Sequence, residues 1–189
     1  MTVGLYFGSF NPVHIGHLAI ASHIVNYTAM NQVWFVVSPQ NPLKTSKSLL
    51  NEYHRLNLIQ LAIEGESKLR ASNIEFSLPR PSFTIDTLTY LNEKYPSYQF
   101  SIIMGSDSLQ NIGKWKNFEL ILSNYPILVY KRPGFNIEEV QHANITVLEA
   151  PLFDISSTRV RDMIMQGNSI RYLVPDVVKD EIERNHYYK

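Results

Sequence analysis

Short β-rich runs alternate with helical patterns along the chain, and this alternation constrains the fold more than any other feature. The β-rich runs are 2–7, 33–37, 99–104, 126–130 and 145–149. Compact apolar runs bounded by turn residues are typical of buried parallel strands. Apolar residues at helical spacing predict helices over 16–27, 51–64, 84–94, 117–123, 156–166 and 175–187. The alternation predicts an α/β fold with a mainly parallel sheet flanked by helices.

The length and composition suit one such unit. The chain has 189 residues, of which 44% are apolar, and it shows no repeat and no Gly/Ser/Pro-rich linker. We therefore expect a single Rossmann-like domain over residues 1–189, with the helices from about residue 156 packed against it. Ligands of such sheets bind beyond the carboxyl ends of the strands.

Charge and cysteine content exclude several kinds of function. The chain carries 17 basic and 17 acidic residues, so its net charge is zero. Nucleic acids and membrane surfaces are held by a positive field, so we expect neither as a partner. The chain has no cysteine, which excludes disulfides, thiolate nucleophiles and cysteine metal sites. Without a signal peptide or an apolar run of roughly 20 residues, a cytoplasmic protein is expected.

The stretch GSFNPVHIGH, residues 8–17, follows the first expected strand. Gly8 and Ser9 allow a sharp turn, and Gly16 and His17 open a helix whose first N–H groups are unpaired. Such a helix start attracts anions, and His14 lies three residues before His17, on the same side. An ordinary turn, a metal site and a phosphate pocket all fit these residues. Zinc is the weakest of the three, because it needs three or four protein ligands.

A second stretch, ISSTRVR, covers residues 155–161. Ser156, Ser157 and Thr158 are typical of a helix start, where a hydroxyl covers a free N–H group. Arg161 can share one helix face with them, and its planar fork matches phosphate oxygens. Alone the stretch is typical of a plain helix cap. Together with the first stretch it offers two helix N-termini to one polyphosphate.

The two stretches resemble known signatures. GSFNPVHIGH resembles the G-x-F-x-P-x-H-x-G-H signature of the HxGH nucleotidyltransferase superfamily, and ISSTRVR resembles its I-S-S-T-x-x-R signature. The pair is similar to bacterial nicotinate-nucleotide adenylyltransferases in particular. Further segments resemble the proline-rich loop and pyridine-nucleotide pocket of that family: SPQNPLK (38–44), PSFTIDTL (81–88), MGSDSLQNIGKWKNF (104–118) and YKRPGF (130–135). Asn11 departs from the usual Asp, and Lys116 stands where the family varies.

The resemblance implies transfer of AMP from ATP to nicotinate mononucleotide, giving nicotinate adenine dinucleotide and pyrophosphate in NAD biosynthesis. The attacking phosphate is already an anion, so the reaction needs in-line placement and charge screening rather than a general base. Mg²⁺ would be held mainly by the ATP phosphates, without a protein metal site. Alternatives are an enzyme preferring nicotinamide mononucleotide, a phosphopantetheine adenylyltransferase, and a non-catalytic nucleotide-binding domain. A homo-oligomer is left open.

The resemblance also implies site residues. The catalytic residues are His14, His17 and Arg161, with the histidines donating hydrogen bonds or charge to the phosphates. The ATP site adds Gly8, Ser9, Phe10, Gly105, Asp107, Ile155, Ser156, Ser157 and Thr158. The nicotinate mononucleotide site comprises Lys44, Thr84, Trp115 and Arg132.

Some of these residues have an alternative role. Asp107 could instead be a helix N-cap, Trp115 a core anchor, and Arg132 a surface residue. Thr84 and the N–H groups near Trp115 would hold the nicotinate carboxylate, because a carboxylate only accepts hydrogen bonds. No role is expected for Lys47, His23, His54, His142, His186 or Arg159.

Overall fold

The computed structural model describes residues 1–40, 48–132, 134–135, 137, 143–151 and 153–189. Lys44, Lys47 and His142 lie outside the described residues, so the role predicted for Lys44 and the absence of a role expected for the other two remain predictions.

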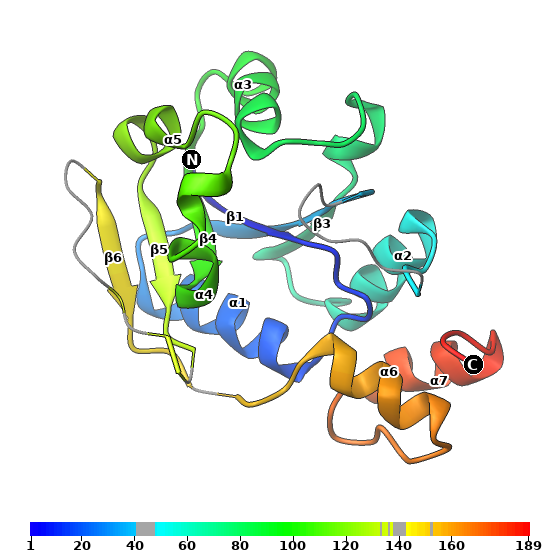
Figure 1. Cartoon of the computed structure of the whole chain (residues 1–189). Coiled ribbons are helices and arrows are strands. Elements are labelled where there is room, and N and C mark those ends of the chain that lie inside the picture. Colours follow the sequence, from blue (N-terminus) through cyan, green and yellow to red (C-terminus); the bar gives the residue numbers. More distant parts are fainter. Residues whose placement is uncertain (41–47, 133, 136, 138–142, 152) are drawn as a thin grey trace.

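Among the described residues, six strands form one parallel sheet in the order β3-β2-β1-β4-β5-β6. The strands are β1 Thr2–Gly8, β2 Gln32–Val37, β3 Leu69–Ser72, β4 Gln99–Gly105, β5 Ile127–Tyr130 and β6 Ile145–Leu148. Strand β1 lies between β2 and β4, with Leu5 opposite Trp34 on one side and Ile102 on the other. The predicted α/β fold with a parallel, Rossmann-like sheet is confirmed (Figure 1).

Helices cover both faces of the sheet. They are α1 Ile15–Tyr27, α2 Glu52–Ala62, α3 Thr84–Lys94, α4 Ser106–Leu109, α5 Phe118–Asn124, α6 Ser157–Met165 and α7 Asp176–Arg184, with short 3₁₀ turns η1 Ile74–Ser77 and η2 Ile112–Lys114. Helices α3 and α5 lie on one side of the sheet, and α1 and α2 lie on the other (Figure 1). Among the described residues, no helix is long and apolar enough to traverse a bilayer.

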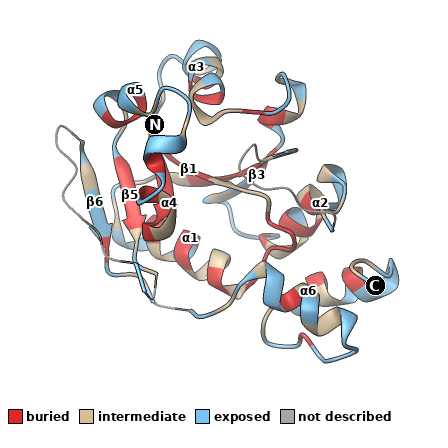
Figure 2. Cartoon of the chain, viewed as in Figure 1, coloured by how far each residue is buried: buried red, intermediate tan, exposed pale blue. Residues whose placement is uncertain are grey.

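Alternate residues of each strand enter opposite cores. Tyr6 and Phe35 point into the core beneath α1, α2, α6 and α7. Leu5 and Trp34, their neighbours in sequence, point into the core beneath α3 and α5. This period of two follows from the pleat of a strand, and it explains why the central strands are apolar throughout. Figure 2 shows the resulting burial along the sheet.

Strand β3 is not predicted by the sequence pattern. It is a four-residue edge strand in which Leu69 and Ala71 are half-buried and Arg70 is exposed, so no apolar run marks it. The guanidinium of Arg70 lies 4.6 Å from the centre of the Trp34 ring, and this cation–π contact links the edge strand β3 to β2.

Candidate active site

The turn after β1 folds back over its own aromatic ring. Phe10 has a φ of 46°, in the left-handed region, yet only 3% of its surface is exposed. Its ring contacts Tyr6 edge-on, with 5.5 Å between the ring centres. A Cβ atom on Gly8 would lie 2.8 Å from this ring, so only glycine fits there. The turn thereby brings the following residues to the carboxyl edge of the sheet.

The two histidines of the turn are stacked. Their ring centres are 3.6 Å apart with 25° between the planes, and the backbone N–H of His14 donates to Nδ1 of His17 at 3.3 Å. His14 is the N-cap residue of α1, so both rings lie at the start of that helix. The predicted placement of His14 and His17 on one side of the helix start is therefore observed.

His14 is neutral at pH 7. Burial, assisted by the positive charge of Arg132, lowers its pKa from 6.5 to about 4. Its Nδ1 atom has no hydrogen-bond partner among the described residues. Without a ligand a buried neutral imidazole offers a hydrogen bond rather than a charge, and the predicted role of His14 towards the phosphates stays a prediction.

The start of α6 is bonded directly to this turn. The Ser157 hydroxyl donates to the carbonyl oxygen of Pro12 at 2.8 Å. Arg161 donates through Nη1 to the carbonyl oxygen of Asn11 at 2.8 Å and through Nη2 to the hydroxyl of Thr158 at 3.3 Å. The two sequence stretches, some 145 residues apart, thus form one surface.

The remaining residues of this stretch shape the same helix start. Ser156 is the N-cap of α6 and accepts from the N–H of Arg159 at 3.2 Å. Ile155 is partly buried and packs against the core beneath α1. Ser156 therefore caps the helix, as its residue type predicts, while its neighbours make the contacts to the first turn.

Asn11 is suited to its place because it is an amide. The side chain is 4% exposed, donates from Nδ2 to the carbonyl oxygen of Ser48 at 3.0 Å, and accepts at Oδ1 from the N–H of Leu50 at 3.1 Å. A carboxylate could accept but could not donate. Asparagine therefore joins the first turn to the segment that leads into α2.

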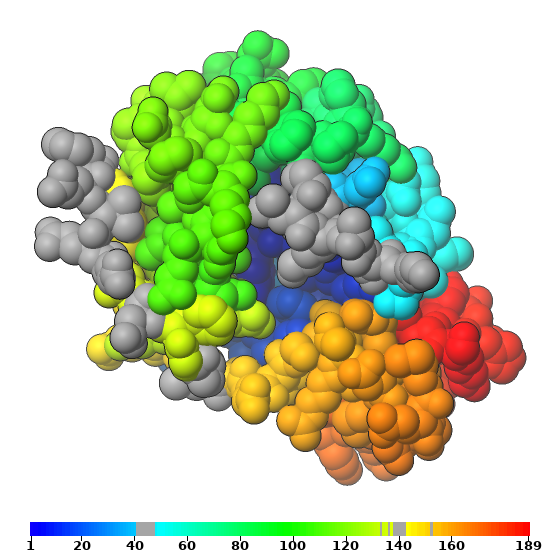
Figure 3. All heavy atoms as spheres, in the orientation of Figure 1, coloured from blue at the N-terminus to red at the C-terminus, as the bar shows by residue number. Residues whose placement is uncertain are grey.

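A cavity of about 470 Å³ opens beside the turn, at the carboxyl ends of β1 and β4. Six of the predicted site residues line it: Gly8, Ser9, Thr84, Gly105, Asp107 and Trp115. Figure 3 shows the hollow, with N-terminal residues in blue at its floor between the green segment around β4 and the orange α6. The cavity therefore continues from the turn towards α3.

Asp107 and Arg132 form an ion pair at the rim, with 3.0 Å between Oδ2 and Nη1. The backbone N–H of Arg132 also donates to the hydroxyl of Ser106 at 2.9 Å. Gly105 is the N-cap of α4, so the alternative role of Asp107 as an N-cap is wrong. Arg132 is likewise tied to the site and is not a free surface residue.

The far end of the cavity is formed by α3 and the segment before α5. Thr84 is the first residue of α3, and two residues later the N–H of Asp86 already donates to the carbonyl oxygen of Phe83 at 3.0 Å. The N–H of Trp115 donates to the carbonyl oxygen of Ile112 at 2.9 Å, so it is not available to a ligand. Lys116 pairs with Asp86 at 2.9 Å and lies 4.9 Å from the centre of the Phe83 ring.

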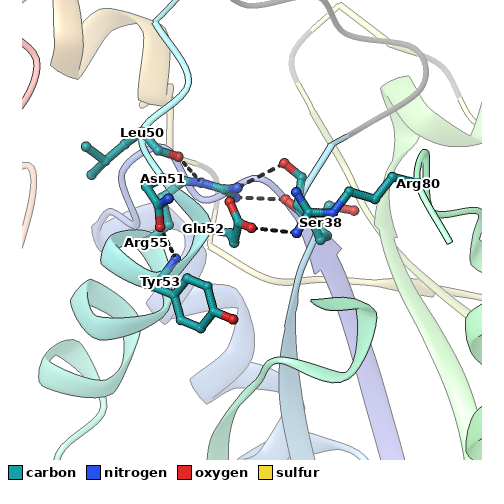
Figure 4. A network of polar contacts seen from close by, with 8 residues as sticks. Ser38, Leu50, Asn51, Glu52, Tyr53, Arg55 and Arg80 are labelled. Carbon is teal, nitrogen blue, oxygen red and sulfur yellow. Dashed lines mark hydrogen bonds and ion pairs between the residues drawn. The ribbon is translucent and has the colours of Figure 1, made fainter. Parts of the chain in front are cut away.

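Two buried ionisable residues of the site carry no motif. Glu75 is 1% exposed, lines the cavity, and accepts from the hydroxyls of Ser38, Ser82 and Thr87 at 2.6–2.9 Å. Arg55 is fully buried in α2 (Figure 4). Arg55 lies three and four residues before buried Leu58 and Ile59, and this spacing is the one signal that could have placed it inside.

The described residues contain no group of three or more His, Cys, Asp or Glu side chains that could hold a metal ion.

The chain is similar to known proteins over its whole length. Residues 5–163 match the family model described as Cytidylyltransferase-like. A protein of Flavobacterium johnsoniae described as "Probable nicotinate-nucleotide adenylyltransferase" is 46% identical over 192 residues, covering 100% of both chains. One of Cytophaga hutchinsonii with the same description is 47% identical, covering 100% of this chain and 98% of its own length. The chain belongs to the nicotinate-nucleotide adenylyltransferase family.

Solved structures share the fold of this nicotinate-nucleotide adenylyltransferase family member. A Plasmodium falciparum nicotinic acid mononucleotide adenylyltransferase, complexed with NaAD, superposes with a TM-score of 0.84 at 22% identity, over 99% of this chain and 97% of its own. A putative nicotinate-nucleotide adenylyltransferase from Vibrio parahaemolyticus gives a TM-score of 0.73 at 18% identity, over 99% and 94%. The fold is therefore common to the family at low sequence identity.

Proposed function

We propose that this chain transfers AMP from ATP to nicotinate mononucleotide, as a step of NAD biosynthesis. Its full-length similarity to nicotinate-nucleotide adenylyltransferases supports this activity. One structural observation carries the proposal. The GSFNPVHIGH turn and the start of α6 are hydrogen-bonded to each other beside a cavity that reaches α3.

The reaction needs no nucleophile from the protein. A phosphate oxygen of nicotinate mononucleotide forms a bond to the α-phosphorus of ATP, and the bond from that phosphorus to the bridging oxygen of the β-phosphate breaks. Pyrophosphate leaves with the electron pair of the broken bond. The protein therefore has to align the two substrates and stabilise charge on the transferring group and the leaving group.

The first turn is suited to the α-phosphate. In this proposal His17 donates a hydrogen bond to the transferring group, while neutral His14 adds a second, uncharged donor. Gly8, Ser9 and Phe10 shape the backbone beneath the triphosphate. The expectation of unpaired N–H groups at the start of α1 is wrong for Ile15 and His17, whose N–H groups donate to the carbonyl oxygens of Leu173 and His14. The dipole of the helix still adds a positive potential there.

The start of α6 is suited to the leaving group. Ser157, Thr158 and Arg161 lie together there, with Ser156 capping the helix. Their hydroxyl and guanidinium groups, with the free N–H groups of the helix, would receive the β- and γ-phosphates. Lys44 remains part of the proposal as a phosphate clamp on sequence grounds alone.

The cavity towards α3 is suited to the nicotinate ring and its carboxylate. Trp115 offers a ring to stack upon, and Thr84 offers its hydroxyl and the N–H groups of the first turn of α3. Donors of this kind favour the acid over the amide, because a carboxylate only accepts hydrogen bonds. Asp107 and Arg132 would lie between the two nucleotides, with Arg132 contacting the mononucleotide phosphate.

Mg²⁺ fits this site as an ion carried by the substrate. The described residues form no cluster of metal-ligating side chains, and Mg²⁺ prefers phosphate oxygens and water. When bound to the triphosphate, the ion would neutralise part of its negative charge. A cytoplasmic location belongs to the same proposal, since the reaction draws on the ATP of the cell.

Pyrophosphate release tests the function. The purified chain is incubated with ATP and Mg²⁺, and with either nicotinate mononucleotide or nicotinamide mononucleotide. We expect release from ATP to be negligible when both mononucleotides are absent, and release with the acid to be much faster than with the amide. Faster release with the amide would overturn the substrate, and no release with either would overturn the activity.

A further inference from the structure

Arg55 has an unusual set of partners. Its side chain is 0% exposed and lies in the first half of α2. Nη1 donates to the carbonyl oxygen of Ser38 at 2.9 Å, and Nε donates to that of Leu50 at 2.7 Å (Figure 4). Nη1 also donates to the carbonyl oxygen of Ser9 at 2.6 Å, and Nη2 donates to that of Pro39 at 3.2 Å. All four acceptors are backbone groups, so what Arg55 fixes is the path of the chain.

The four carbonyls belong to three separate segments. Ser9 is in the turn after β1, Ser38 and Pro39 follow β2, and Leu50 precedes α2. The N–H of Ser38 also donates to the carbonyl oxygen of Gly8 at 3.0 Å, so the ends of β1 and β2 are held together on two sides. Only the rigid, five-donor fork of arginine can reach so many acceptors at once.

No carboxylate in the described ranges is hydrogen-bonded to Arg55. The nearest acid in the chain, Glu52, instead pairs with Arg80 at 2.6 Å (Figure 4). At hydrogen-bond distance the charge of Arg55 is therefore met by carbonyl dipoles, and the carboxylate of Glu52 acts on it only through space. The positive potential of Arg55 extends to Ser9, which lines the cavity. In a poorly hydrated interior such a potential favours an anion bound in front of the turn.

We propose that Arg55 is a positioning residue for the triphosphate of ATP. It acts through the backbone of the turn at Gly8–Ser9 and joins that turn to the segments at Ser38 and Leu50, without contacting either substrate. This inference rests on the proposed function, because it assigns the turn to ATP. It predicts that loss of the fork weakens ATP binding and leaves the nicotinate end of the cavity unchanged.

The principal test is Arg55→Lys, which keeps the positive charge and removes the fork. The affinity for α,β-methylene-ATP is measured by calorimetry, and the KM for each substrate is measured by turnover. We expect ATP-analogue binding to weaken on the order of 10-fold to 100-fold, as for misplaced binding groups. The KM for nicotinate mononucleotide should stay within about twofold of the wild-type value.

Two controls separate positioning from simple loss of stability. Ile127→Val trims a fully buried side chain at the far end of β5 and lowers stability without touching the turn. Arg184→Lys repeats the same chemical change at a residue whose side chain is 75% exposed. Both controls should bind the ATP analogue as the wild type does.

Hydrogen exchange on the wild-type protein gives a test that needs no variant to fold. Addition of the ATP analogue should protect amides of residues 8–14 and, through Arg55, amides of residues 48–58, which do not line the cavity.

The proposal is overturned by any of four results. These are unchanged analogue affinity in Arg55→Lys, an equal loss of affinity for both substrates, a similar loss in Ile127→Val, or protection confined to residues 8–14. A wild-type chain that binds the analogue but makes no dinucleotide would overturn the proposed function alone, and the binding measurements would still decide the role of Arg55.

Discussion

Several ionisable side chains of this site have neutral surroundings, unlike Asp107 and Arg132, which pair with each other. Arg55 donates to carbonyl groups, Glu75 accepts from hydroxyls, and His14 is itself uncharged. The substrates bring several negative charges, so positive groups that are not already paired with carboxylates retain their field for the ligand. Arg161 follows the same pattern, since it donates to a carbonyl and a hydroxyl.

Replacement of His17 by Ala tests the residue closest to the proposed chemistry. Loss of one donor to a developing charge costs about 10²–10³ in rate in comparable cases. We expect turnover of His17→Ala to fall by that factor, with the circular dichroism spectrum and melting temperature close to those of the wild type. A folded variant with nearly normal turnover would contradict the role of His17.

His14 makes the stability of the protein depend on pH. Its pKa of about 4 in the folded state lies below the value of 6.5 expected when unfolded. Between these values the unfolded chain binds a proton that the folded chain does not, so stability is lost as the pH falls. From pH 7 to pH 5 the loss due to His14 is about 2 kcal/mol.

Urea unfolding of the wild type and of His14→Gln at both pH values measures this effect. The wild type should lose about 2 kcal/mol more than the variant between pH 7 and pH 5. Equal losses in the two proteins would show that His14 titrates normally.

The sequence predicts the site residues that belong to a motif, but it does not predict buried residues such as Arg55, which hold the backbone in place through hydrogen bonds. Motif spacing predicted His14, His17 and Arg161 in one site; the two histidine rings are stacked, and Arg161 donates to the backbone of the same turn at Asn11. A lone arginine in a helix and a lone glutamate carry no such pattern, because their partners are carbonyls and hydroxyls far along the chain. The sequence also left open whether His14 offers a hydrogen bond or a charge, since burial is a property of the fold.

Among the elements, helix α1, which begins at the histidines, has little room for a larger side chain at Gly16. A Cβ atom on Gly16 would lie 3.2 Å from two ring atoms of His14. That ring is buried and stacked on His17, so it has little room to move. Glycine at this position therefore protects the geometry of the site at some cost in helix propensity.

Gly16→Ala should consequently lower turnover while leaving stability nearly unchanged. Alanine favours the helix by up to about 1 kcal/mol, and the displaced ring offsets this gain. We expect turnover to fall about 10-fold, a fraction of the loss that a 1 Å misplacement brings. Ser22→Ala, an exposed position of the same helix, is the control and should leave turnover unchanged. A fully active Gly16→Ala enzyme would show that the His14 ring is free to shift.

Two kinds of element could be predicted: strands that are buried on both faces, and helices whose apolar residues recur at a regular spacing. The central strands are apolar on both faces and the long helices repeat their apolar residues, so their positions follow from the sequence. Strand β3 was missed because half of it faces solvent and its pairing partner, β2, lies some 35 residues earlier. Edge strands owe their existence to the neighbouring strand more than to their own residues.

Across the whole molecule, the C-terminal residues close against α2. Tyr187 contacts Nδ1 of His54 through its hydroxyl at 2.9 Å. The hydroxyl of Tyr188 is buried and has no partner among the described residues, and burial raises its pKa. Two adjacent tyrosines therefore contribute in opposite ways, one through a bond made and one through a hydroxyl that costs free energy to bury.

The two Tyr→Phe variants should change stability in opposite directions. Tyr188→Phe removes a buried hydroxyl without a partner and should raise the free energy of unfolding by about 1 kcal/mol. Tyr187→Phe removes a hydrogen bond and should lower it by up to about 1 kcal/mol. Urea unfolding of both variants at pH 7 measures the difference. A loss of stability in Tyr188→Phe would mean that its hydroxyl is satisfied in solution.

The place of β1 in the middle of the sheet also has a consequence for synthesis of the protein. One edge of β1 pairs with β2, some 30 residues later, and the other pairs with β4, nearly 100 residues later. A nascent chain released as far as β3 can form half a sheet, but its β1 edge stays open until β4 emerges from the ribosome. An open, apolar edge invites pairing with other chains. The same strand that leads into the histidine turn is therefore the segment most in need of protection during translation.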